Sequence, residues 1–167
     1  GFLAARRLAK EGVPINFTLG FSARQNYLAA QLTNPKFVNV FMGRLNSFVA
    51  DNSLGSGENV GEKTTLATQR YVNELCDAGL SGSKLIGASM RSREQVISLA
   101  GLDVFTMPVK VAKGYSEEPA ESVENQVGND PAVPLNDGVK LEDFNGGSLW
   151  EVSDEFKKAV GGLMEKD

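Results

Sequence analysis

The chain has 167 residues, with 17 Lys or Arg, 21 Asp or Glu and no histidine. Its length can bury a hydrophobic core, but it contains no apolar run of about 18 residues that would span a membrane, and its net charge of −4 gives no support for nucleic-acid binding. The lack of histidine excludes Ser-His-Asp catalysis, Cys-His catalysis and His-based metal sites within these residues, and the lone Cys76 fits a reducing compartment such as the cytoplasm.

Helix and strand patterns alternate along the chain as far as residue 107. Ser22 with Gln25, and Ser92 with Gln95, have the capping-box spacing that opens a helix. Elsewhere, apolar alternation indicates strands, and apolar residues at helical spacing indicate helices. In chain order we predict a helix over 2–11, a strand over 15–21, a helix over 22–32, a strand over 37–45, a loop over 46–62, a helix from 64 or 65 to 78, a strand over 84–89, a helix over 92–100 and a strand over 103–107.

The repeated strand-helix order predicts a parallel sheet with helices packed against it. In the strand over 15–21, Ile15 and Phe17 face one side, whereas Asn16 and Thr18 face the other. Polar residues on the side away from the helices are typical of the interior of a (β/α)8 TIM barrel near its mouth. Because such a barrel needs eight strands, we expect this α/β chain to form only half of one.

The composition changes after the last predicted strand. Residues 116–145 contain eight acids, one base and three prolines, which is typical of a solvated linker or a long surface loop. Beyond Ser153, apolar residues recur at helical spacing and predict an amphipathic helix. We therefore predict three parts: half of a barrel over 1–115, an acidic linker or loop over 116–148 and a C-terminal amphipathic helix over 149–167.

Polar side chains gather where the predicted strands end. The carboxyl ends of parallel strands share one edge of the sheet, and active sites of such folds lie there. A guanidinium at this edge suits a phosphate or a carboxylate, although arginines here would equally suit surface ion pairs. The residues are Asn16, Thr18 and Ser22; Asn39 and Arg44; Ser89 and Arg91; and Lys110 and Lys113, the last two interpreted as ordinary basic residues.

The glycine-rich loop over 55–64 does not have the spacing of a nucleotide-binding loop. A Walker loop needs Gly-Lys-Ser/Thr in succession, and Glu62 separates Gly61 from Lys63. We interpret these glycines as loop residues. Cys76 lies on an apolar helix face and is interpreted as a small buried hydrophobic residue.

Three segments resemble the transaldolase family in its order and spacing. The first reads EGVPINFTLGFS over 11–22 and resembles the fifth barrel strand of the family. The second reads FVNVFMGRL over 37–45 and resembles the sixth, although Asn39 and Val40 replace a family serine and proline. The third reads IGASMRSREQVISLAGLD over 86–103 and resembles the seventh strand with its helix, with Met90 in place of a phenylalanine. The chain thus resembles the C-terminal half of the barrel, strands five to eight, followed by the family's C-terminal extension.

The resemblance implies a class I aldolase that moves a dihydroxyacetone unit between sugar phosphates through a Schiff base on lysine, without metal or cofactor. By resemblance, Thr18 would position the catalytic water. The substrate-binding residues would be Asn16 and Asn39 for hydroxyl groups, Phe41 for the pocket wall, and Arg44, Ser89 and Arg91 for the phosphate. The implied partners are fructose 6-phosphate, sedoheptulose 7-phosphate, erythrose 4-phosphate and glyceraldehyde 3-phosphate, with no nucleic acid and no membrane.

The family's Schiff-base lysine lies on the strand before Phe2 and is absent from this chain. We therefore expect the parent protein to be a transaldolase of the pentose phosphate pathway in the cytoplasm, and the isolated chain to be an inactive fragment. Two alternatives stay open. One is an enzyme like fructose-6-phosphate aldolase on the same scaffold, and the other is a non-catalytic half-barrel module for phosphate binding or assembly.

Overall fold

Four parallel strands form one sheet, and their order in the sheet is β1-β2-β3-β4. The computed structural model describes residues 1–139 and Asp154, so the predicted helix over 149–167 lies, apart from Asp154, outside the described residues. The strands are β1 (Asn16–Phe17), β2 (Phe37–Phe41), β3 (Lys84–Ala88) and β4 (Val104–Phe105). The helices are α1 (Phe2–Lys10), α2 (Ala23–Thr33), α3 (Met42–Asp51), α4 (Val60–Asp77), α5 (Arg93–Ser98) and α6 (Val109–Glu117).

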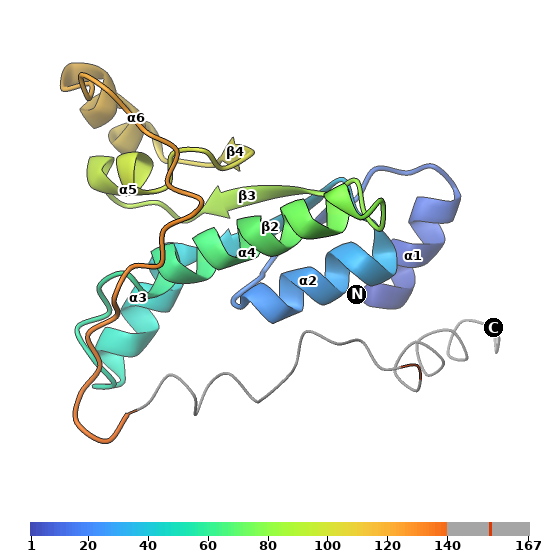
Figure 1. Cartoon of the computed structure of the whole chain (residues 1–167), viewed down its shortest axis with the longest axis horizontal. Helices are drawn as coiled ribbons and strands as arrows, with labels where there is room; N and C mark the ends of the chain where they lie inside the picture. The colour runs from blue at the N-terminus through green and yellow to red at the C-terminus, as the bar shows by residue number, and fades with distance from the viewer. Residues whose placement is uncertain (140–153, 155–167) are drawn as a thin grey trace.

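The core lies between the sheet and the helices that follow its strands. Side chains alternate between the two faces of a strand, so Val38 and Val40 of β2 share a face with their neighbour Leu85 of β3. All three are fully buried and pack with residues of α2 and α4. Figure 1 shows α2 and α4 lying side by side, with α4 crossing in front of β2. The opposite face of the same strands carries Asn39 and Phe41.

The sequential strand order supports the predicted architecture. In a doubly wound sheet the strand order reverses at a switch point, whereas in a barrel each strand lies beside the next one in the chain. All three strand pairs are parallel, and each joins consecutive strands. The predicted parallel α/β fold is therefore confirmed, and its strand order is that of a barrel.

The predicted strand over 37–45 and loop over 46–62 are wrong in part. Strand β2 ends at Phe41, and helix α3 begins at once with Met42, so Arg44 lies in the first turn of a helix and not on a strand. Phe41 stands at the N-cap position without a side-chain cap, so the usual Ser, Thr, Asp or Asn signal is missing. Helix α4 also begins earlier than predicted, at Val60.

The predicted strand over 15–21 is also too long, because only Asn16 and Phe17 pair with β2. Leu19 has a φ of 63°, a left-handed conformation that ends the extended alternation. Both predicted caps are confirmed. Ser22 Oγ accepts the Gln25 N–H at 3.1 Å to open α2, and Ser92 Oγ accepts the Gln95 N–H at 3.4 Å to open α5.

The acidic segment, over its described part, is attached to the helices. Figure 1 shows it running in orange from α6 across α4 and past α3. Lys63 Nζ lies 2.5 Å from Asp130 Oδ1, and the Arg70 guanidinium donates to the carbonyls of Val127 and Asn129 at 2.9 and 2.8 Å. An isolated bridge joins Gly55 to Leu135. The division into 1–115, 116–148 and 149–167 stays a prediction.

Glycine is required at position 43, where α3 meets the turn after β3. A Cβ atom there would lie 2.2 Å from the carbonyl oxygen of Ser89 and 2.7 Å from Arg91 Nε. Both distances are well inside van der Waals contact, so any larger residue would push α3 away from this turn. Within the described residues, no helix is long and apolar enough to cross a membrane.

The Asp130 contact predicts a dependence of stability on pH. The hydrogen bond from Lys63 lowers the pKa of Asp130, so its contribution to folding is complete above the ordinary aspartate pKa and is lost as the pH falls through the lowered value. Because Asp130 is largely exposed, we expect Asp130→Asn to reduce the free energy of unfolding by less than about 1 kcal/mol at pH 7. The difference from the wild type, measured by urea denaturation, should close towards about pH 3.

Asp137→Asn is the matched control, because Asp137 is also exposed and lies in the same segment. It should leave the stability unchanged at both pH values. If Asp130→Asn lowered the free energy of unfolding by the same amount at pH 7 and at pH 3, this would contradict this interpretation of the Lys63 contact.

Gly43→Ala tests the close approach of α3. Overpacking should lower the free energy of unfolding by about 1–3 kcal/mol, despite the higher helix propensity of alanine. Gly114→Ala in α6 is the control, because a Cβ atom there meets nothing within 4 Å; it should raise stability by about 0.5–1 kcal/mol. Thermal and urea unfolding measure both effects, and equal behaviour of the two variants would show that α3 is not closely packed at Gly43.

Candidate active site

The seven residues to which the family resemblance assigns a role all lie at or near the carboxyl ends of the first three strands. Each of the first two strands carries one or two of the residues, and the turns or helices that follow the three strands carry the others. Asn16 lies on β1 and Thr18 just after it; Asn39 and Phe41 lie on β2, with Arg44 in the first turn of α3; and Ser89 and Arg91 lie between β3 and α5.

Asn16 and Asn39 form a direct pair across β1 and β2. Asn39 Nδ2 donates to Asn16 Oδ1 at 2.5 Å and to the Phe17 carbonyl at 3.2 Å. The Asn39 side chain is buried, whereas Asn16 is exposed. Asn39 therefore fixes the orientation of Asn16, and because the Asn16 oxygen already accepts from Asn39, its Nδ2 group is the donor that it presents at the surface.

Arg91 is held against α3 by its side chain. Its Nη1 donates to Ser47 Oγ at 2.5 Å, and its Nε lies beside Gly43, where the missing side chain leaves room for it. Arg91 itself is exposed. The guanidinium is thus fixed in position at the strand-end edge while its remaining N–H groups can reach a ligand.

Ser89 connects β3 to Arg91 through a strained backbone. Its φ is 64°, which is uncommon for a residue other than glycine and costs about 1–3 kcal/mol. The Ser89 carbonyl packs against Gly43, and this contact holds the turn in place. Residues in such conformations cluster at functional sites, and this signal is not visible in the sequence.

Arg44 lies over an aromatic ring. Its guanidinium carbon is 5.5 Å from the centroid of Phe41, a cation–π distance, and Phe41 in turn packs on Phe21 at 6.0 Å between centroids. The ring thus restricts where the Arg44 charge can lie. Within the described residues, no hydrogen bond joins either arginine to the pair of Asn16 and Asn39.

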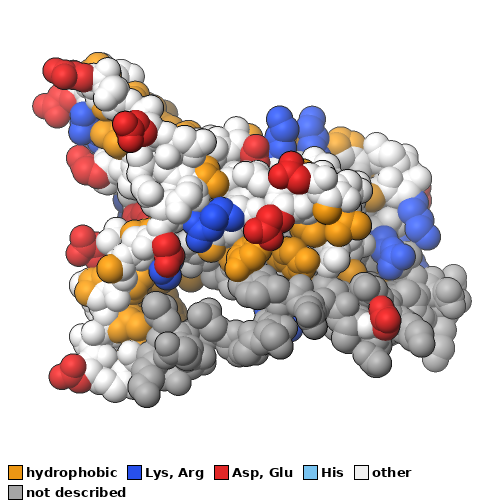
Figure 2. Space-filling view, viewed as in Figure 1, with side chains coloured by type: hydrophobic (Ala, Val, Ile, Leu, Met, Phe, Trp, Pro, Cys, Tyr) orange, Lys and Arg blue, Asp and Glu red, His pale blue; other side chains and the backbone are white. Residues whose placement is uncertain are grey.

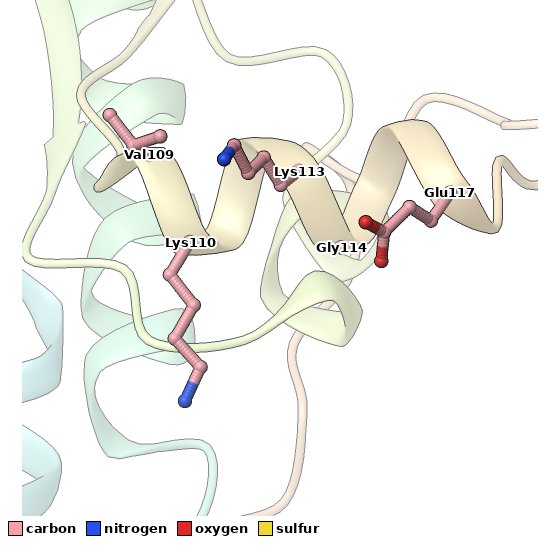
Figure 3. Close-up of a pocket in the computed structure, with 5 residues that line it drawn as sticks. All are labelled: Val109, Lys110, Lys113, Gly114 and Glu117. Atoms are coloured by element: carbon pink, nitrogen blue, oxygen red, sulfur yellow. The ribbon is translucent and has the colours of Figure 1, made fainter.

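Thr18 is exposed beside the edge strand β1. Together with Asn16 it lines a mainly apolar hollow of about 290 Å³ between β1 and α1. A larger hollow, of about 530 Å³, lies along α6 and is lined by none of the seven strand-end residues. Figure 3 shows that a single helix supplies its residues, among them Lys110, Lys113 and Glu117, so the two ammonium groups share an open face with a carboxylate and define no enclosed site.

Sequence reasoning missed three side chains that support Arg91. They are Ser47 on α3, the side-chain oxygen of Gln95, and Glu62, which in the sequence stands out only as an interruption of a Walker motif. Ser47 was missed because residues 46–62 are predicted to form a loop. Only a helix over 42–51 places Ser47 one turn after Gly43.

The residue types at the strand ends are ones that suit an anion. Figure 2 shows acidic and basic side chains interspersed over the helix-covered side of the molecule, with no large area of a single sign there. At the strand ends, by contrast, Arg44 and Arg91 accompany neutral hydroxyl and amide groups. Within the described residues, no group of three or more Asp, Glu, His or Cys side chains is placed to hold a metal ion.

Known proteins match the chain over most of its length. A family model described as Transaldolase/Fructose-6-phosphate aldolase matches residues 1–149. A probable transaldolase from Dictyostelium discoideum is 28% identical over 96% of this chain and 51% of its own length. Probable transaldolases from Thermus thermophilus and Clostridium acetobutylicum are 34% and 35% identical over 74% of this chain, and over 50% and 52% of their own lengths.

The chain therefore spans about half the length of the curated relatives it matches. The match includes all four strands of the parallel sheet and all seven residues described above at the strand ends. On this evidence the chain belongs to the transaldolase/fructose-6-phosphate aldolase family.

Proposed function

We propose that this chain provides the phosphate-binding side of a transaldolase active site. The observation that carries the proposal is the Arg91 guanidinium, which is fixed to Ser47 at the strand-end edge and lies next to the Ser89 turn. A guanidinium held in this way can form two parallel hydrogen bonds to a phosphate. The proposed substrates are sugar phosphates: fructose 6-phosphate and sedoheptulose 7-phosphate as donors, and erythrose 4-phosphate and glyceraldehyde 3-phosphate as acceptors.

The other side chains of the group would bind the sugar. The exposed Nδ2 of Asn16 would donate to a hydroxyl of the three-carbon unit, and Asn39, which is buried, would support Asn16. Thr18 would position a water molecule. Phe41 would line the pocket and hold Arg44 near the phosphate, because the guanidinium lies over its ring.

The proposed reaction transfers a dihydroxyacetone unit through a Schiff base, within the pentose phosphate pathway and in the cytoplasm. A lysine amine attacks the ketose carbonyl and water leaves, which gives the covalent carrier. The resemblance assigns this lysine to a strand that the 167 residues do not contain. We therefore propose that catalysis needs residues beyond this chain, which serves as the C-terminal half of the barrel, strands five to eight.

Two alternatives lead to different products or to none. An aldolase would release the three-carbon unit without an acceptor, whereas a transaldolase needs an acceptor aldose, so analysis of the products of the complete protein, with and without the acceptor, separates them. A half-barrel module for phosphate binding or assembly would bind phosphate and give no product with either.

Arg91→Ala should weaken the binding of inorganic phosphate, measured by isothermal titration calorimetry. Because Arg91 is exposed, we expect the lower end of the range for a charged hydrogen bond, about 1.5 kcal/mol or roughly tenfold in Kd. Lys84→Ala is the matched control, since it removes one positive charge at the opposite end of β3. Equal Kd values for Arg91→Ala and the wild type would remove Arg91 from the phosphate site.

Borohydride trapping tests the proposed location of the Schiff base. The isolated chain, incubated with fructose 6-phosphate and borohydride, should show no covalent adduct by mass spectrometry, whereas a complete transaldolase treated in parallel should gain one. An adduct on Lys110, Lys113 or any other lysine of this chain would contradict the proposal.

A further inference from the structure

A network of polar side chains, centred on the buried Glu62, connects helices α3, α4 and α5 behind the ends of the strands. Asn46 of α3 donates through Nδ2 to Glu62 Oε2 at 3.0 Å, and Gln95 of α5 donates through Nε2 to Glu62 Oε1 at 2.6 Å. Asn46 Oδ1 also accepts the Gly61 N–H at 2.6 Å. Glu62 is 6% exposed and Gln95 9%, so the contact between these two side chains is shielded from water, whereas Asn46 is half-buried.

The hydrogen bonds between the Asn46, Glu62 and Gln95 side chains have a fixed direction. A carboxylate only accepts, so both amide NH2 groups must point towards Glu62, and each amide oxygen must then point away from the Glu62 carboxylate. The side-chain oxygen of Gln95 accepts the backbone N–H of Arg91 at 2.7 Å. The orientation of the Gln95 amide, and with it the anchor of the Arg91 backbone, is therefore set by the carboxylate of Glu62.

The same helices also hold the Arg91 side chain. Ser47, which binds the guanidinium, follows Asn46 directly in α3. Glu62 thus acts on Arg91 by two routes, through Gln95 to the backbone and through Asn46 to the helix that carries Ser47. A purely packing role would not need a buried carboxylate here, since apolar residues of similar volume are often as stabilising as buried charges.

We propose that Glu62 is a positioning residue for Arg91 and determines how strongly the strand-end face binds a phosphorylated ligand. The inference rests on the proposed function in one respect, namely that Arg91 contacts the phosphate. It assigns to Glu62 and Gln95 the role of holding the arginine in the binding orientation before the ligand arrives.

Because the donors and acceptors of these side chains have a fixed order, exchanging the residues at positions 62 and 95 is informative. In Glu62→Gln an NH2 group replaces an acceptor and opposes the NH2 of Asn46 or Gln95. In Gln95→Glu two carboxylates oppose one another. In the double variant, the new amide at position 62 would accept from Asn46 and donate to the new carboxylate at position 95. That carboxylate would also accept the Arg91 N–H, so every donor again meets an acceptor while the net charge is unchanged.

Binding of inorganic phosphate by the wild-type chain and the three variants is the test. We expect each single variant to bind about tenfold more weakly, the effect of losing one hydrogen bond that orients a charged group, and the double variant to return to within about threefold of the wild type. Hydrogen exchange at the Arg91 amide, followed by NMR, should accelerate in the single variants and recover in the double variant.

The outcomes separate the two claims. If the wild type binds phosphate and Arg91→Ala binds it more weakly, but Glu62→Gln binds normally with unchanged Arg91 exchange, the positioning role is wrong. Folded single variants whose losses are not recovered in the double variant would also overturn it. If the wild type binds no phosphate, the proposed function fails, and the Arg91 exchange rates alone decide whether Glu62 positions Arg91.

Discussion

The close contact between α3 and the turn after β3 is the constraint on which the strand-end face depends. Glycine at position 43 lets the Ser89 carbonyl and Arg91 Nε approach the helix to distances that no side chain would permit. This contact keeps Ser89 in its left-handed conformation and brings Arg91 within reach of Ser47. Backbone packing at Gly43, together with the hydrogen bond to Ser47, therefore places the guanidinium.

Hydrogen bonds behind this contact connect the site to the rest of the fold. Glu62 joins three helices through Asn46 and Gln95, and the segment after α6 lies across α4 through its contacts with Lys63 and Arg70. The helix layer is thus fixed both beneath the site and on its outer surface. Such an arrangement suits a binding face whose groups must be in place before a ligand binds.

Local signals in the sequence predicted the parts of the fold that local interactions determine. The caps at Ser22 and Ser92 and the buried strands β2 and β3 follow from spacing over a few residues. The start of α3 could not be predicted, because Phe41 provides no cap and the apolar alternation of β2 continues into Met42. Tertiary packing, including the contact of Met42 with Gly61, determines this boundary.

The same distinction holds for the site. Its strand-end residues could be found because they follow predicted strands, but Glu62 could not, since its partners lie 16 and 33 residues away in the chain. Titration with inorganic phosphate, followed residue by residue by NMR, tests most directly whether this face binds a phosphate group. We predict saturable shifts centred on Arg44, Ser89 and Arg91; shifts confined to Lys110 and Lys113 on α6, or no saturable shifts, would contradict this conclusion.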